Sequence, residues 1–264
     1  MRTFEAGCND EGAPAVVMLH GMGHWTEAAW SSLAAHFAHS HRVVAFDLPG
    51  FGASDKPDVH YSLAYFTSAL RAVVRATRVH EFALVGHSLG GLIAANYAAY
   101  HPGQIRALGL LDPAGFLRTP RLAARIAGSR LALTLRLRLR PPRAFVRATL
   151  RRAVYDDGVL GPDVRERAYA LASDPATVRA FLRVYAGAAD QWRGMRELHA
   201  RFAAYGGPTT LIWGREDRYI PARGLRSARR VYPHADALVI PRCGHCPGIE
   251  YPELVAQRLL ANGF

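Results

Sequence analysis

Short runs of apolar residues, apolar on both parities, recur through the first and last thirds of this 264-residue chain. Side chains alternate between the two faces of a strand, so such runs suit a parallel sheet that is covered on both faces. Each run is four to seven residues long and is stopped by Gly, Pro or Asp. We therefore predict strands at Ala15–Leu19, Arg42–Phe46, Phe82–Val85, Ile105–Leu111, Thr209–Trp213 and Ala237–Ile240.

Helical patterns lie between these runs, and two of them begin with proline, which suits the first turn of a helix. Strands that alternate with helices predict an α/β fold, here a doubly wound and mostly parallel sheet. The predicted helices span Trp30–Phe37, Tyr65–Ala76, Ser88–Tyr100, Pro221–Val231 and Pro252–Leu260.

The middle of the chain breaks this alternation, because no strand in it is followed by a helix. Two stripes at helical spacing, one starting at Val178 and one at Trp192, indicate helices instead. We predict a helical, Arg-rich cap at residues 116–204, inserted after the strand that ends near Leu111. The core would then comprise residues 1–115 and 205–264.

The segment Leu131–Arg140 is ambiguous. Its leucines alternate with other residues, which favours a strand with one apolar and one basic face. Its composition of Leu, Arg and Ala favours a helix, and an amphipathic segment on a membrane surface is a third interpretation. We predict a helix there and keep the strand as the alternative.

A G-x-S-x-G motif, Gly86 to Gly90, lies between a predicted strand and a predicted helix. A serine on such a sharp turn has unfavourable backbone angles, and a glycine two positions to either side clears space for it. The turn exposes the hydroxyl of Ser88, and the start of the helix places the N–H of Leu89 beside it. The motif therefore predicts that Ser88 is a nucleophile.

A serine nucleophile needs a base that is oriented by a third group. In this strand–turn–helix setting, the acid and then the histidine follow the serine along the chain. His245 lies just past the last predicted strand, and Asp217 follows the strand before it. We predict these two residues as base and acid, with Asp112 as an alternative acid and Glu216 as a weaker one.

An oxyanion hole needs two N–H donors. Leu89 supplies one. The loop after the first predicted strand, His20 to Gly23, should supply the other, and Met22 is the candidate.

In this order the motifs resemble the α/β-hydrolase superfamily, in particular its cap-bearing branch that works without a cofactor. The resemblance spans nearly the whole chain and implies a triad of Ser88, Asp217 and His245 beneath a helical cap. It also implies hydrolysis of carboxylic esters or thioesters, or of C–C bonds as in some members. It rests on HGMG at 20–23, DLPGFGASD at 47–55, GHSLGG at 86–91, WGREDRYIP at 213–221 and CGH at 243–245.

Three features separate this chain from parts of that superfamily. Its epoxide hydrolases and haloalkane dehalogenases use Asp as nucleophile, so Ser88 argues against both. Its C–C hydrolases of ring-cleavage pathways tend to have Trp after the catalytic histidine, where this chain has Cys246. Few residues precede Ala15, so we expect the leading antiparallel strands to be reduced to Arg2–Ala6 or missing.

We predict a serine hydrolase that cleaves a carboxylic ester of an apolar acyl group through an acyl-enzyme, with no metal or organic cofactor. Three alternatives stay open: a thioesterase or carrier-protein ester hydrolase, a C–C bond hydrolase, and a low-turnover ligand-binding protein on the same fold. Candidates for lining the substrate pocket are His24, Trp25, His87, Phe116, Ile220 and Cys246.

The formal net charge is +12, and residues 116–206 hold 18 arginines against 7 acidic residues. Such a basic region attracts anionic partners, which motivates the alternative of an anionic acyl carrier. No nucleic-acid motif accompanies it, so nucleic acid is not an expected partner.

Targeting and redox signals are weak. No run approaches the roughly 20 apolar residues of a membrane span, and the first apolar run is too short for a signal peptide. We therefore expect a cytoplasmic protein with no stable membrane anchor.

Cys243 and Cys246 have C-x-x-C spacing but lie near the C-terminus, after an apolar run. A thioredoxin-type redox pair belongs at a helix start after early strands, so that function is disfavoured.

Overall fold

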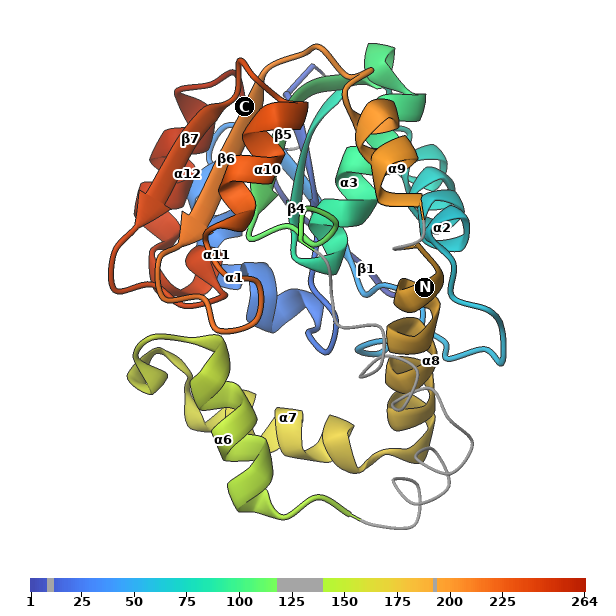
Figure 1. Ribbon diagram of the computed structural model, residues 1–264, viewed down its shortest axis with the longest axis vertical. Helices are drawn as coiled ribbons and strands as arrows, with labels where there is room; N and C mark the ends of the chain where they lie inside the picture. The colour runs from blue at the N-terminus through green and yellow to red at the C-terminus, as the bar shows by residue number, and fades with distance from the viewer. Residues whose placement is uncertain (9–11, 118–139, 192–193) are drawn as a thin grey trace.

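The computed structural model describes residues 1–8, 12–117, 140–191 and 194–264 (Figure 1). The helix predicted over Leu131–Arg140 falls outside these residues, apart from Arg140.

Among the described residues, seven strands form one sheet in the order β1-β3-β2-β4-β5-β6-β7. The leading strand β1 pairs antiparallel with β3, and the other neighbours are parallel. The doubly wound, mostly parallel sheet is therefore confirmed, with a single short strand ahead of it in the described residues. The bounds are β1 Thr3–Gly7, β2 Ala15–Leu19, β3 Arg42–Phe46, β4 Phe82–His87, β5 Ile105–Leu111, β6 Thr209–Gly214 and β7 Asp236–Ile240.

Helices cover both faces of the sheet. Val17 and Leu19 of β2 belong to the cluster that packs under α2, α3, α9 and α10. Val16 and Met18, on the opposite parity, pack with α1 and α12. This division explains why the strands are apolar on both parities. The bounds are α1 Thr26–Phe37, α2 Leu63–Ala76, α3 Leu89–Tyr100, η1 Pro102–Gln104, α9 Met195–Phe202, α10 Gly224–Val231, α11 Pro247–Glu250 and α12 Pro252–Leu260.

Four helix starts differ from the prediction. Helix α2 begins at Leu63 and not at Tyr65, and α3 begins at Leu89 and not at Ser88. The starts of α1 and α10 differ further. Helix α1 begins at Thr26, four residues before Trp30, because the carboxylate of Asp47 accepts the Thr26 N–H at 2.8 Å. That bond satisfies one of the donors that a helix start leaves open. Helix α10 begins at Gly224 and not at Pro221. The Gly224 N–H donates to Pro221 O at 2.9 Å, so residues 221–223 form a turn ahead of the helix.

Helices α6 (Arg143–Ala153), η2 (Asp157–Val159), α7 (Pro162–Ser173) and α8 (Pro175–Gln191) lie between β5 and β6 in the chain. Figure 1 shows α6, α7 and α8 extending past one end of the sheet, whereas α9 returns to lie beside α3. We refer to residues 140–204 as the intervening helices. None of the helices in the described ranges is both long and apolar enough to cross a membrane.

Candidate active site

Ser88 stands where β4 ends and α3 begins, with φ +53° and ψ −115°. A side chain at either flanking glycine would collide with backbone. A Cβ on Gly86 would lie 2.3 Å from Gly90 O, and one on Gly90 would lie 2.1 Å from Leu19 O. The backbone is pinned in this turn, since Ser88 N–H donates to Leu111 O at 3.0 Å. The strained turn expected from the motif is therefore present.

The loop after β2 runs beside this turn. A Cβ built on Gly21 would lie 3.0 Å from the Cβ of Ser88. Met22 is the next residue after Gly21, so its N–H belongs to a segment that contacts the serine. The first backbone bond of α3 runs from Leu92 N–H to Ser88 O, which leaves the N–H of Leu89 with no acceptor inside its helix. The two predicted oxyanion donors thus belong to segments that adjoin Ser88.

His245 and Asp217 contact each other directly. The Nδ1–H of His245 donates to Asp217 Oδ2 at 2.7 Å, and both residues are buried. The other carboxylate oxygen of Asp217 accepts the N–H groups of Tyr219 and Ile220 at 2.7 and 2.9 Å. These bonds hold the carboxylate in place and leave Nε2 of His245 as the nitrogen without a proton. Of the acids considered, Asp217 is the one that orients this histidine.

Asp112 lies in the same cluster but bonds elsewhere. Asp112, Asp217 and His245 have side-chain oxygen or nitrogen atoms within 4.8 Å of one another. Asp112 Oδ1 accepts the Gly214 N–H at 3.0 Å. Complete burial, together with the charge of Asp217, raises the pKa of Asp112 well above its usual range. This carboxyl therefore keeps its proton to a higher pH than an ordinary aspartate does, which limits repulsion of the Asp217 carboxylate.

Other histidines brace the loops around Ser88. The Nε2–H of His87 donates to the backbone carbonyl of His245 at 2.6 Å. Burial and the nearby His245 lower the pKa of His87 well below its usual value, so the ring stays neutral. Burial also lowers the pKa of His24 to about 3. His20 accepts the Leu48 N–H at 2.9 Å and so ties the loop after β2 to the one after β3.

The loop that carries His245 is held by contacts that the sequence does not suggest. The Glu250 carboxylate accepts the Gly244 N–H at 2.8 Å and, through its other oxygen, the Tyr155 N–H at 2.6 Å. The His245 N–H itself donates to Ala153 O, at the end of α6, at 2.7 Å. The intervening helices are thus bonded directly to the histidine loop, through backbone groups that leave no signal in the sequence.

Tyr219 and Phe181 are two further neighbours of the site that sequence reasoning missed. The ring of Tyr219 lies 5.4 Å from that of His245, and its hydroxyl donates to Thr149 O of α6 at 3.0 Å. Phe181 of α8 lies 3.3 Å from where a Cβ on Gly23 would stand, beside the proposed oxyanion loop. The helical stripe through Val178 was the available signal for Phe181.

The predicted pocket residues occupy different surroundings. Trp25 is buried, with the guanidinium of Arg167 from α7 at 5.8 Å from its ring. Ile220 is half-buried, and its N–H bonds Asp217. Phe116 lies in the core, 5.5 Å from the ring of His199 and 6.0 Å from that of Phe202. Phe116 thus fixes α9 against the sheet.

The two cysteines beside His245 are both buried and free. Burial raises the pKa of the Cys243 and Cys246 thiols, so both are protonated at neutral pH. A redox-active C-x-x-C pair needs a thiolate, and its pKa is lowered instead. Cys246 packs with Val154 and Leu160 of the intervening helices.

Comparison with known proteins decides the family. A family model described as the alpha/beta hydrolase fold matches residues 14–252. The chain belongs to the α/β-hydrolase fold family. This α/β hydrolase is 28% identical over 242 residues to an uncharacterised protein of Mycobacterium tuberculosis, covering 89% of this chain and 70% of that one.

Proteins with a named hydrolase activity have a similar percentage identity to this chain. The chain is 29% identical to a 2-hydroxymuconate semialdehyde hydrolase of Pseudomonas sp., covering 89% of this chain and 82% of that one. Among solved structures, a bacterial membrane phospholipase A is 27% identical with a TM-score of 0.78, covering 98% of this chain and 80% of that one. These relatives support a hydrolase and leave the bond that it cleaves open.

Proposed function

We propose that this α/β hydrolase cleaves a carboxylic ester of an apolar acyl group, with Ser88, His245 and Asp217 as its catalytic triad. The observation that carries the proposal is the bond between His245 Nδ1 and Asp217 Oδ2, with the His245 carbonyl bonded to His87, the residue before a serine on a strained turn. The same three residue types in these roles recur in serine hydrolases on unrelated folds.

In the proposed first step, Nε2 of His245 takes the proton of the Ser88 hydroxyl, and the Oγ of Ser88 attacks the carbonyl carbon of the ester. Asp217 stabilises the imidazolium that forms, because its carboxylate already bonds Nδ1–H. The N–H groups of Leu89 and Met22 would bind the oxyanion, and each such donor contributes about 3–4 kcal/mol to transition-state stabilisation.

Collapse of this intermediate releases the alcohol, which takes the proton from His245, and leaves an acyl group on Ser88. A water activated by His245 then attacks the acyl-enzyme and regenerates the serine. The apolar side chains beside the site, Phe181 and Cys246 among them, favour an apolar acyl group over a charged one.

A C–C bond hydrolase is the second candidate. The 29% identity to a 2-hydroxymuconate semialdehyde hydrolase favours it. Cys246 stands where ring-cleavage C–C hydrolases tend to have Trp, so we rank the ester first. Both candidates use the same serine and histidine, and only the substrate separates them.

Two measurements test the proposal in sequence. Intact mass after treatment with a fluorophosphonate should show one adduct on the wild-type protein and none on Ser88→Ala. A panel of p-nitrophenyl esters of increasing chain length, an acyl thioester and a dienoate C–C substrate then ranks the candidates. Turnover of the dienoate ahead of every ester would replace the first candidate with the second. A folded wild-type protein without an adduct would favour a ligand-binding protein.

A further inference from the structure

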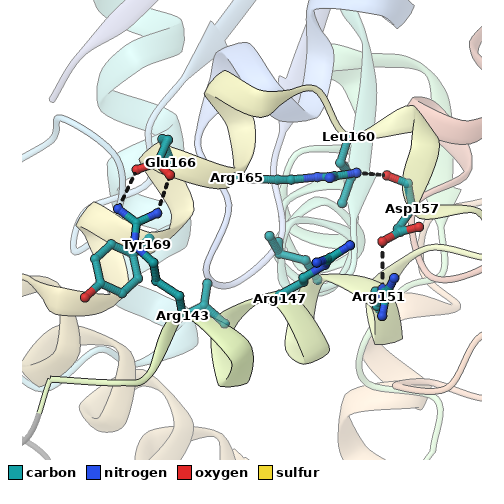
Figure 2. A pocket seen from close by; sticks show the side chains of 10 residues that line it. Arg143, Arg147, Arg151, Asp157, Leu160, Arg165, Glu166 and Tyr169 are labelled. Carbon is teal, nitrogen blue, oxygen red and sulfur yellow. Dashed lines mark hydrogen bonds and ion pairs between the residues drawn. The ribbon is translucent and has the colours of Figure 1, made fainter.

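A cleft of about 230 Å³ lies between α6 and α7, and none of the residues proposed for catalysis lines it. Its walls carry four arginines and two acids, so its formal charge is +2 (Figure 2). We refer to it as the α6–α7 cleft. The ten residues that line it are Arg143, Val146, Arg147, Leu150, Arg151, Asp157, Leu160, Arg165, Glu166 and Tyr169.

The two acids of the cleft are already paired. Glu166 bonds Arg143 in a bidentate ion pair, and Asp157 Oδ2 bonds Arg151 Nε at 2.7 Å. Arg165 donates to the backbone carbonyl of Asp157 at 2.5 Å. Within the described residues, neither Arg165 nor Arg147 makes an ion pair with a carboxylate, although the charges of both help to lower the pKa of Asp157.

Arg147 and Arg165 come from different walls. Arg147 comes from α6 and Arg165 from α7, and the charged ends of both side chains point into the space between the two helices (Figure 2). Like charges at close range repel each other, and an anion between them would turn that repulsion into attraction. Two planar guanidinium groups together offer paired N–H donors that match the oxygens of a phosphate.

The floor of the α6–α7 cleft is apolar. Val146 and Leu160 are buried, and Leu150 is partly buried against Leu160. The same apolar cluster continues to Cys246, next to His245. The volume is below the roughly 300–1,000 Å³ of pockets for drug-sized ligands, so it suits a small group. A charged rim over an apolar floor fits an amphiphile with one anionic end.

We propose that the α6–α7 cleft binds the phosphate of a phosphate ester with an apolar tail, with Arg147 and Arg165 as the phosphate ligands. The formal charge of +2 matches a phosphate monoester, which carries about −1.5 to −2 at neutral pH. The tail would lie over Val146, Leu150 and Leu160. Such a site would hold an anionic substrate, or the membrane that contains it, beside the site at His245.

Binding of hexyl phosphate tests this proposal directly by calorimetry at one fixed ionic strength. Hexyl phosphate contains no carboxylic ester, so its binding is independent of the proposed hydrolysis by Ser88. Arg147→Gln and Arg165→Gln should each raise Kd about tenfold, the effect of losing a hydrogen bond to a charged group. Arg179→Gln, at an exposed position on α8 outside the cleft, is the charge-matched control.

Uncharged hexyl glucoside separates phosphate recognition from binding of the tail, and the proposal requires it to bind far more weakly. Equal Kd values for the three variants, or glucoside binding as tight as that of the phosphate, would overturn the proposal. Arg147→Gln and Arg179→Gln should melt at the wild-type temperature without ligand, because both side chains are exposed. Arg165 is half-buried and bonds Asp157 O, so the Kd of Arg165→Gln is measured well below its own melting temperature.

Two sources of the phosphate are then distinguished by sedimentation with phosphatidylcholine vesicles, with or without phosphatidic acid. Retention on the acidic vesicles that is lost in Arg147→Gln would identify a lipid headgroup as the source. Hexyl phosphate binding without vesicle retention would identify a soluble phosphate ester. If the wild-type protein binds neither hexyl phosphate nor the acidic vesicles, the cleft is not a phosphate site.

Discussion

Every residue of β2, β4 and β6 is buried, whereas α7 has no buried residue and α6 has one, Val146. The sheet is thus held by close backbone approach and apolar packing on two faces. Helix α6 and the residues after it are bonded to the sheet region near His245, while α8 and α9 also pack on its core through Ala180, Val184, Leu198 and Phe202. Ser88 and Asp217 depend on the sheet, while the loop of His245 depends on both regions.

The largest expected effect separates the two buried carboxyls Asp217 and Asp112, whose substitution should change kcat by very different factors. Asp217→Asn should lower kcat about 10⁴-fold, because an amide no longer fixes the imidazole tautomer. Asp112→Asn should change kcat less than about tenfold, since Asp112 bonds the Gly214 N–H and not His245. The measurement is kcat on the best ester for both variants, with circular dichroism to establish folding. Equal losses would mean that the two acids share the role.

A side chain at Gly90 tests the close packing of the sheet region. Because its Cβ would lie 2.1 Å from Leu19 O, Gly90→Ala should lower the free energy of unfolding by at least about 3 kcal/mol. Gly206→Ala is the control, since no atom lies within 4 Å of a Cβ there, and its effect should stay within about 0.5 kcal/mol. Urea denaturation measures both. If the two variants are equally stable, α3 can move away from β2 at little cost.

The core could be predicted from local patterns because its strands are apolar on both parities. The bounds of Ala15–Leu19 and Ile105–Leu111 match the structure to the residue. The start of α1 could not be predicted, since its first N–H is satisfied by Asp47, 21 residues further along the chain. Local patterns thus determine where elements lie, and contacts between distant residues determine where they end.

The candidate site divides in the same way. The motif around Ser88 and the chain order of Asp217 and His245 pointed to the bond between the last two. Glu250 could not be found in this manner, because its partners are backbone N–H groups, one of them 95 residues away at Tyr155. Backbone donors are the same in every residue except proline, so the sequence carries no mark of such a bond.

Glu250 offers a way to loosen the intervening helices from the histidine loop. In Glu250→Gln, only one side-chain oxygen remains, so the amide NH₂ would face the N–H of either Tyr155 or Gly244. That backbone N–H would lose its acceptor, and a donor left without an acceptor costs free energy. We expect kcat to fall about tenfold, the effect of about 1.4 kcal/mol in the barrier. Glu253→Gln, at an exposed position on α12, is the control.

The readout for Glu250 is kcat against KM together with the melting temperature. A displaced His245 lowers kcat even where the protein remains folded, whereas a purely structural role would lower the melting temperature and leave kcat at low temperature unchanged. The second pattern would show that the intervening helices do not influence the histidine.

The smallest effect concerns how Asp112 links stability to pH. Its folded pKa is raised well above the usual value by burial and by Asp217, so the folded protein keeps a proton that the unfolded chain releases. The stability from this protonated carboxyl is present below the unfolded pKa of about 3.9 and is lost as pH rises towards the folded pKa. Asp112→Asn removes that loss. Its free energy of unfolding relative to wild type should therefore increase from pH 4.5 to 7.5 in urea titrations, whereas a constant difference would mean that Asp112 is ionised in the fold.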